Sequence, residues 1–279
     1  MGDLTLVRTL GHRTVYILLG LGVSAGLLGG LLGIGGGAII VPGLVFFLNF
    51  DQHRAHGTSL AVVLAMSLAS VAAYWRGGHI DWLLAVEMAF GGVLGACVGA
   101  RVVAALNGPV LRWIFALFLV SVGVRMIVAG LLGPKGAPQA QHALSGMNLA
   151  AHVLLAVGLG VVTGFLSSLL GIGGGMVMVP AMVLVLGVDQ HTAQGVSLAA
   201  IMPTALTGAF LHLNMGNVEI RVAKWVGTGA LIGGATGASV ATLLCPATLK
   251  LFFGVFLVVM AVLMALKRQG SRPGECEVA

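Results

Sequence analysis

Long apolar segments separated by short polar or Gly/Pro-containing stretches make up nearly the whole chain. Ten of them fall at roughly 14–32, 36–50, 57–75, 82–106, 110–132, 150–170, 174–188, 195–213, 221–244 and 248–266. Stretches such as 111–132 and 249–266 are apolar on nearly every face, as helices in lipid are, whereas the strands of a barrel would alternate apolar and polar residues. The pattern predicts an all-α polytopic membrane protein.

The last five segments repeat the first five at an offset of 138 residues. Between 20–42 and 158–180, 15 of 23 positions are identical, and Asp51-Gln52-His53 matches Asp189-Gln190-His191. Chance similarity between apolar sequences does not give so many matches in one register. We therefore predict a first membrane repeat (1–132), a polar linker (133–148), a second membrane repeat (149–267) and a cytoplasmic tail (268–279).

The number of crossings in each half sets how the halves are oriented. Five crossings are odd, and so are three, if the first two segments form a re-entrant hairpin. In both cases the second half enters from the opposite side, as in an inverted-topology repeat. If only one of the first two segments crosses, this parity argument fails. The second segment of each half has only about 15 residues, and a full span needs about 20, which favours short, glycine-broken or re-entrant helices.

Composition and charge agree with a membrane location. The chain of 279 residues is 58% hydrophobic and 8% charged, with a mean hydropathy of +1.08, whereas soluble domains carry about 25% charged residues. Of the 14 Lys and Arg residues, ten lie at predicted inner ends of segments, three at outer ends and one within a segment. This bias predicts a bacterial inner-membrane protein with both termini in the cytoplasm. The basic residues are too scattered for nucleic-acid binding, and a homodimer is possible.

Each half contains a glycine-rich interruption, Leu31–Gly37 or Leu169–Gly175, followed by Pro42 or Pro180. Glycine costs roughly 1 kcal/mol relative to Ala inside a helix, and a broken helix at membrane depth needs protein or a water-filled cavity around it. Free N–H groups at the start of the next helix attract an anion. Two breaks facing each other would form one shared site. The alternative is that the glycines only allow close helix packing.

Hydroxyl groups near the breaks extend this prediction, because Ser59 and Ser197 begin the third segment of each half. They would donate to an oxyanion, or bond back to their own helix. The predicted substrate-binding residues are Gly33, Gly35, Gly36, Gly37, Ser59, Gly171, Gly173, Gly174, Gly175 and Ser197.

Ionisable residues supply candidates for coupling or gating. His53 and His191 could relay a proton beside Asp51 and Asp189, or the two Asp residues could simply cap the next helix. Arg125 is an intramembrane charge that could also reach the interface. Glu87, five residues into its segment, could pair with a basic residue or bind and release a proton. The runs Gly91/Gly95/Gly99 and Gly229/Gly233/Gly237 predict helix packing.

The duplicated motif Gly-Leu-Leu-Gly-Ile-Gly-Gly-Gly-x-x-x-Val-Pro at Gly30–Pro42 resembles the TauE/SafE family of sulfite exporters, and Ser168–Pro180 has Ser in place of the first Gly. The resemblance covers both halves. It implies a proton-coupled transporter, by its name an exporter, of small sulfur-containing or organic anions such as sulfite or sulfonates. We expect alternating access; the alternative is an anion channel using the same glycines. No catalytic constellation, metal spacing or cofactor motif is present, so we expect no enzyme, cofactor or metal site.

Overall fold

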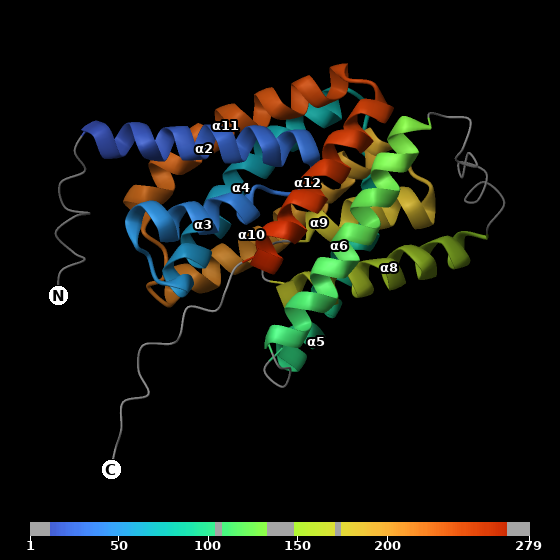
Figure 1. Cartoon of the computed structure of the whole chain (residues 1–279), viewed down its shortest axis with the longest axis horizontal. Helices are drawn as coiled ribbons and strands as arrows, with labels where there is room; N and C mark the ends of the chain where they lie inside the picture. The colour runs from blue at the N-terminus through green and yellow to red at the C-terminus, as the bar shows by residue number, and fades with distance from the viewer. Residues whose placement is uncertain (1–11, 104–107, 133–147, 171–173, 267–279) are drawn as a thin grey trace, which may run out of the picture.

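A computed structural model describes residues 12–103, 108–132, 148–170 and 174–266 (Figure 1). The secondary structure of these residues is helical. The elements are α2 (His12–Leu32), α3 (Gly37–Leu48), α4 (Gln52–Arg76), α5 (Trp82–Val103), α6 (Gly108–Leu131), α8 (Leu149–Leu170), α9 (Gly175–Ala181), the π-helical η2 (Met182–Leu186), α10 (Gln190–Asn214), α11 (Ile220–Leu243) and α12 (Pro246–Leu266). Most of the predicted linker, 133–147, and the tail from 267 onward lie outside the described residues.

The chain is an all-α polytopic membrane protein, as predicted. Seven of its helices are long and apolar enough to cross a bilayer, and α3, Phe115–Leu131 of α6 and the continuous α9–η2 helix are shorter apolar helices. Large apolar side chains such as Phe46 and Leu243 are exposed on helix surfaces, where lipid can cover them. The second helix of each half, Gly37–Leu48 or Gly175–Leu186, is one of these shorter helices, as the sequence indicated.

Helix bounds repeat at the offset found in the sequence, so that α4 and α10 coincide residue for residue. Both begin five residues earlier than the apolar pattern predicted. The side chain of Asp51 accepts a hydrogen bond from the Arg54 N–H, and that of Asp189 accepts from the N–H groups of His191 and Thr192. These N-caps extend helical structure into a polar stretch that hydropathy alone assigns to a turn.

The two halves interleave, because the first helix of each packs along the fourth helix of the other: α2 along α11 and α8 along α5 (Figure 1). A side chain at Gly26 would meet the Ala230 carbonyl, and the equivalent Gly164 faces the Gly92 carbonyl. Such reciprocal contacts are expected where a two-fold axis relates two surfaces. Gly91 and Gly95 of α5 and Gly229, Gly233 and Gly237 of α11 face backbone atoms of the neighbouring helix in the same way. The predicted packing role of these five glycines is confirmed.

Equivalent helices near the centre run in opposite directions. Gly57, near the start of α4, faces His212 and the Asn217 carbonyl beyond the end of α10, and the equivalent Gly195 of α10 faces the His79 carbonyl. In α6 and α12, Gly123 contacts Gly254 and Gly130 contacts Ala247. The halves are thus joined through antiparallel α4–α10 and α6–α12 contacts.

Candidate functional site

The break between α2 and α3 is a tight left-handed loop. Gly33, Gly35 and Gly36 have φ values of 73°, 81° and 70°, a region that residues with a Cβ rarely adopt. The Ile34 N–H donates to the Gly29 carbonyl at 3.1 Å, and the Ile34 side chain is buried. The loop ends α2 and starts α3 in a new direction with no side-chain cap.

The described end of the second break, at Gly175, lies against this loop. A Cβ on Gly175 would come within 2.6 Å of the Gly33 carbonyl oxygen and 2.5 Å of the Ile34 Cα. Gly171 and Gly173 lie outside the described residues. Around Gly175, therefore, the structure brings the two predicted breaks into direct backbone contact.

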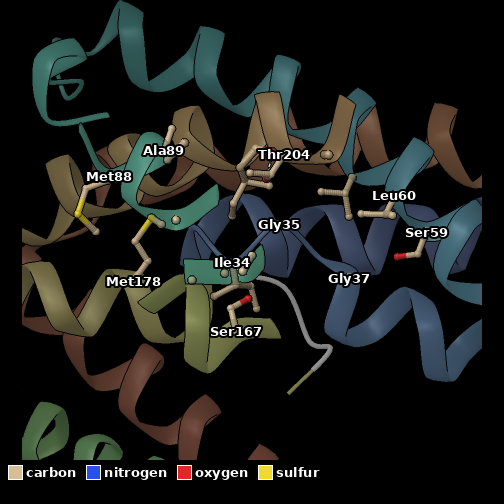
Figure 2. A pocket seen from close by; sticks show the side chains of 18 of the residues that line it. Ile34, Gly35, Gly37, Ser59, Leu60, Met88, Ala89, Ser167, Met178 and Thr204 are labelled. Atoms are coloured by element: carbon tan, nitrogen blue, oxygen red, sulfur yellow. Dashed lines mark hydrogen bonds between the residues drawn. The ribbon is translucent and has the colours of Figure 1, made fainter. Parts of the chain in front are cut away.

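Beside this contact is a cavity of about 200 Å³ between the halves (Figure 2). Its walls are mainly apolar, with Leu60 of α4, Met88 of α5 and Met178 of α9 among them. The polar side chains that line it come from α4, α8 and α10. They are His56, Ser59, Ser167 and Thr204.

The predicted glycines divide into two groups at this cavity. Gly35, Gly37 and Gly174 line it. The other predicted glycines that the structure describes pack against protein: a Cβ on Gly33 would meet Gln194, and one on Gly36 would meet the Ala25 carbonyl and Met66. Gly175 contacts the opposite loop, as described above. Close packing, one of the two interpretations weighed from the sequence, thus holds for Gly33, Gly36 and Gly175. The ligand cradle stays a prediction for Gly35, Gly37 and Gly174, which line the cavity.

Ser59 and Ser197 are equivalent in sequence and differ in surroundings. Ser59 is buried and lines the cavity (Figure 2). Ser197 is fully buried, and its hydroxyl donates to the Gly33 carbonyl at 2.9 Å. Ser197 therefore fixes α10 to the glycine loop of the other half.

The predicted coupling residues are not among the residues that line the cavity. Asp51 and Asp189 cap their helices, which is the simpler of the two interpretations considered. His53 and Arg125 are exposed, and His191 is buried with Nε2 near two backbone carbonyls. A role of these residues in coupling or gating stays a prediction.

Sequence reasoning did not select His56, Ser167 or Thr204, because their equivalents differ in type. These equivalents are Gln194, Gly29 and Met66. Three of the four polar residues that line the cavity therefore differ between the repeats, and only Ser59 has an equivalent of the same type, Ser197. A comparison of the halves for polar differences would have found them.

A second buried polar group lies on the other side of the first glycine loop. The Tyr74 hydroxyl is 3.0 Å from Gln194 Oε1 and 3.1 Å from the Gly30 carbonyl. Both polar side-chain atoms of Gln190 and the Nε2 of Gln194 are buried without a partner among the described residues. Buried amides normally make hydrogen bonds, so these atoms are available to water or a ligand.

A buried acid–base pair joins α5 and α8. Glu87 has a 6% exposed side chain, and its Oε2 lies 3.5 Å from His152 Nδ1. Both Glu87 oxygens lack a hydrogen bond among the described residues. An intramembrane carboxylate of this kind is a candidate functional group.

The sequence matches the family model described as Sulfite exporter TauE/SafE over residues 17–159 and 155–278. The chain belongs to the TauE/SafE sulfite exporter family. Its relatives include the probable membrane transporter protein YunE of Bacillus subtilis, 31% identical over 80% of this chain and 87% of that protein. A probable membrane transporter protein of Xylella fastidiosa is 29% identical over 90% of this chain and 94% of its own length. TauE/SafE membership makes this chain a multi-pass membrane transporter.

Proposed function

We propose that this TauE/SafE protein transports a small oxyanion, such as sulfite or a small sulfonate, through the cavity between its halves. One observation carries the proposal: residues at both glycine breaks line the same cavity as the hydroxyl groups of Ser59 and Ser167, and of Thr204, whose hydroxyl also donates to the Ile201 carbonyl at 2.7 Å. A buried oxyanion needs several donors to offset the loss of hydration.

Helix starts provide such donors. Gly37 is the first residue of α3, and Gly174 precedes α9; both line the cavity. The first N–H groups of a helix have no partner within it, and they carry the positive end of its dipole. His56 is the one ionisable side chain among the described residues of the lining, so no carboxylate there opposes an anion.

The apolar walls favour an anion with a small organic group. Val63, Met88 and Ile201 offer no hydrogen bonds, whereas the methyl or methylene group of a short sulfonate gains free energy when it leaves water. This supports sulfonates at least as well as sulfite.

The proposed cycle is alternating access by an inverted-topology repeat. The antiparallel contacts of α4 with α10 and of α6 with α12 support inversion, since they are pairs of equivalent helices. The halves would move against each other around the cavity. We place the protein in the bacterial inner membrane with both termini in the cytoplasm, because of the distribution of Lys and Arg.

Anion transport in this cycle is coupled to the movement of protons. Besides the predicted His and Asp residues, the buried Glu87 pairs with the half-buried His152, and Glu87 directly precedes the cavity-lining Met88 in α5. A carboxyl group in this position can bind and release a proton during the cycle.

The experiment is anion flux into proteoliposomes with and without a pH gradient. We expect saturable flux of sulfite or a short sulfonate that responds to the gradient. Unitary currents in planar bilayers, without saturation, would instead support the channel. Anion flux equal to that of protein-free liposomes across a panel of sulfite, sulfonates and acetate would contradict transport of this class.

The variant Gly174→Ala tests the location of the site. Gly174 has φ −59°, and an added Cβ would have its nearest contacts at 3.8 Å from Ser167 Oγ and 4.0 Å from the end of Met178. The methyl group therefore fits and enters the cavity, so we expect a raised KM for the anion. Gly158→Ala is the matched control, because nothing lies within 4 Å of its Cβ. Equal KM values in the two variants would rule out this cavity as the site.

A further inference from the structure

We propose that His79, Asp189 and His191 form a binding site for a divalent transition metal ion, with Zn²⁺ as the probe. The ligand atoms of these three side chains lie within 4.8 Å of one another. Two imidazoles and one carboxylate are a common ligand set for Zn²⁺ with one position open to water. Modest side-chain rotations bring ligands this close to about 2.0–2.2 Å from one ion.

His191 is already oriented as a metal ligand. Its side chain is 9% exposed, and its Nε2 lies 3.1 Å from the Ala241 carbonyl and 3.0 Å from the Leu244 carbonyl. Because carbonyl oxygens only accept hydrogen bonds, Nε2 is the nitrogen placed to donate to them, and Nδ1 is the nitrogen left to bind a metal. That Nδ1 is 3.8 Å from Asp189 Oδ1. Metal-binding His residues typically donate their second N–H to such a carbonyl or to a carboxylate.

The other two ligands are held in place by the backbone. The helix cap holds the Asp189 carboxylate in place through Oδ1, and a carboxylate has further lone pairs for a metal. The His79 N–H donates to the Tyr74 carbonyl at 3.0 Å, and the His79 carbonyl lies against Gly195. The imidazole rings of His79 and His191 are stacked with centroids 4.9 Å apart. The site is thus assembled from both halves.

The opposite end of the molecule provides an internal comparison. The equivalents of His79, Asp189 and His191 are Asn217, Asp51 and His53. Asn217 lacks an imidazole, His53 is exposed, and at this end Arg54 and Glu219 form an ion pair at 2.9 Å. Among the described residues, the structure therefore assigns metal binding to the end that contains His79 and not to the end that contains Asn217. Sequence spacing gave no sign of it, because His79 and His191 lie in different halves.

Bound metal would restrain transport. His79 belongs to the turn between α4 and α5, while Asp189 and His191 begin α10, so one ion would tie the two halves together. Trp75 and Trp82 flank the turn as an exposed edge-to-face pair, typical of the membrane–water interface. The regulatory part of this inference rests on the proposed alternating access and orientation, which put the site on the outer face; metal binding itself does not.

Calorimetric titration of the purified full chain with Zn²⁺ tests the site. We expect one ion per chain, and an affinity lowered at least 10- to 100-fold in His79→Asn, since loss of even a second-shell partner costs about that much. His79→Asn copies the residue of the other half, so it should fold, and the melting temperature checks this. His53→Ala is the matched control and should leave Zn²⁺ affinity unchanged. Equal affinity in wild type and His79→Asn would overturn the site.

A second measurement tests regulation separately. Zn²⁺ added outside proteoliposomes should slow anion flux in the wild type and not in His79→Asn, which should transport normally without metal. Unchanged wild-type flux at saturating Zn²⁺ would overturn the regulatory part. If no anion is transported at all, the proposed function fails, while the titration still decides whether the metal site exists.

Discussion

At the scale of single residues, equivalent positions in the two repeats have different structural roles. Ser59 lines the cavity, whereas Ser197 donates to the Gly33 carbonyl. His56 lines the cavity, whereas its equivalent Gln194 lies beside Tyr74. The duplication thus supplies two similar backbone frameworks. The side chains that differ between them leave a cavity beside Ser59 and His56 and form packed contacts around Ser197 and Gln194.

Substituting Ser59 and Ser197 one at a time separates the role in anion binding from the role in stability. We expect Ser197→Ala to lower stability by about 1–3 kcal/mol, because the buried Gly33 carbonyl loses its donor. Ser59→Ala should instead weaken anion binding about tenfold or more, since a hydrogen bond to a charged group contributes about 1.5–3 kcal/mol.

Thermal unfolding in detergent measures the first effect, and ligand-induced stabilisation by sulfite or a sulfonate measures the second. The interpretation is wrong if both variants lose stability alike and both keep wild-type anion affinity.

At the scale of helices, close backbone contact joins the halves. Along α2, Gly22, Gly26 and Gly30 face backbone atoms of Val226, Ala230 and Gly234 of α11, so α2 approaches the backbone of α11 where α2 itself has no side chain. Without a hydrophobic driving force between helices in lipid, such packing is a main source of association. Small residues at this spacing therefore decide which helices become neighbours.

One pair of glycines tests this contact within a single helix. In Gly22→Ala the new Cβ would clash with the Val226 carbonyl, and we expect a loss of about 1–3 kcal/mol. Gly20→Ala, also in α2, has nothing within 4 Å of its Cβ, and should be neutral or gain up to about 1 kcal/mol from helix propensity. Melting temperatures of both variants in one detergent give the comparison; a more stable Gly22→Ala would contradict the packing.

At the scale of the whole molecule, the halves are interleaved rather than adjacent. Each contributes its first helix to the other's fourth helix, and α4 and α10 cross the centre in opposite directions. The cavity lies to one side of this arrangement, since its described lining comes from the first glycine loop, α3, α4, α5, α8, α9 and α10 and includes no residue of α2 or α11. These contacts are the ones expected of the proposed inverted repeat, in which a two-fold axis lies in the membrane plane.

Two equivalent turn glycines test the inversion. Gly78 and Gly216 have φ values of 71° and 73°, and nothing lies within 4 Å of either Cβ. A cysteine therefore fits at either position, and the positive φ imposes a similar backbone strain on both. In a chain with Cys97, Cys245 and Cys276 replaced by Ser, we expect Gly78→Cys to react with an impermeant maleimide on intact cells. Gly216→Cys should react only after permeabilisation. Labelling of both from the same side would refute inverted topology.

Much of the fold was predictable, because hydropathy and glycine placement act locally. The ten helical segments, the short second helix of each half and the packing role of the glycine runs in α5 and α11 follow from composition and spacing. The starts of α4 and α10 were wrong because hydropathy cannot register an Asp cap. The candidate site was predictable only in part: Gly35, Gly37, Gly174 and Ser59 line the cavity, whereas His56, Ser167 and Thr204 were missed.

The sequence by itself determined that this is a duplicated helical membrane protein with a break in each half, since these properties depend on which residues follow one another. Only the tertiary structure decided what the two breaks face. Gly33 turns toward α10 and Gly174 toward the cavity, and His79 meets His191 from the other half. Such contacts depend on how antiparallel and interleaved helices pack in three dimensions, and identical motifs acquire different neighbours once the residues around them differ.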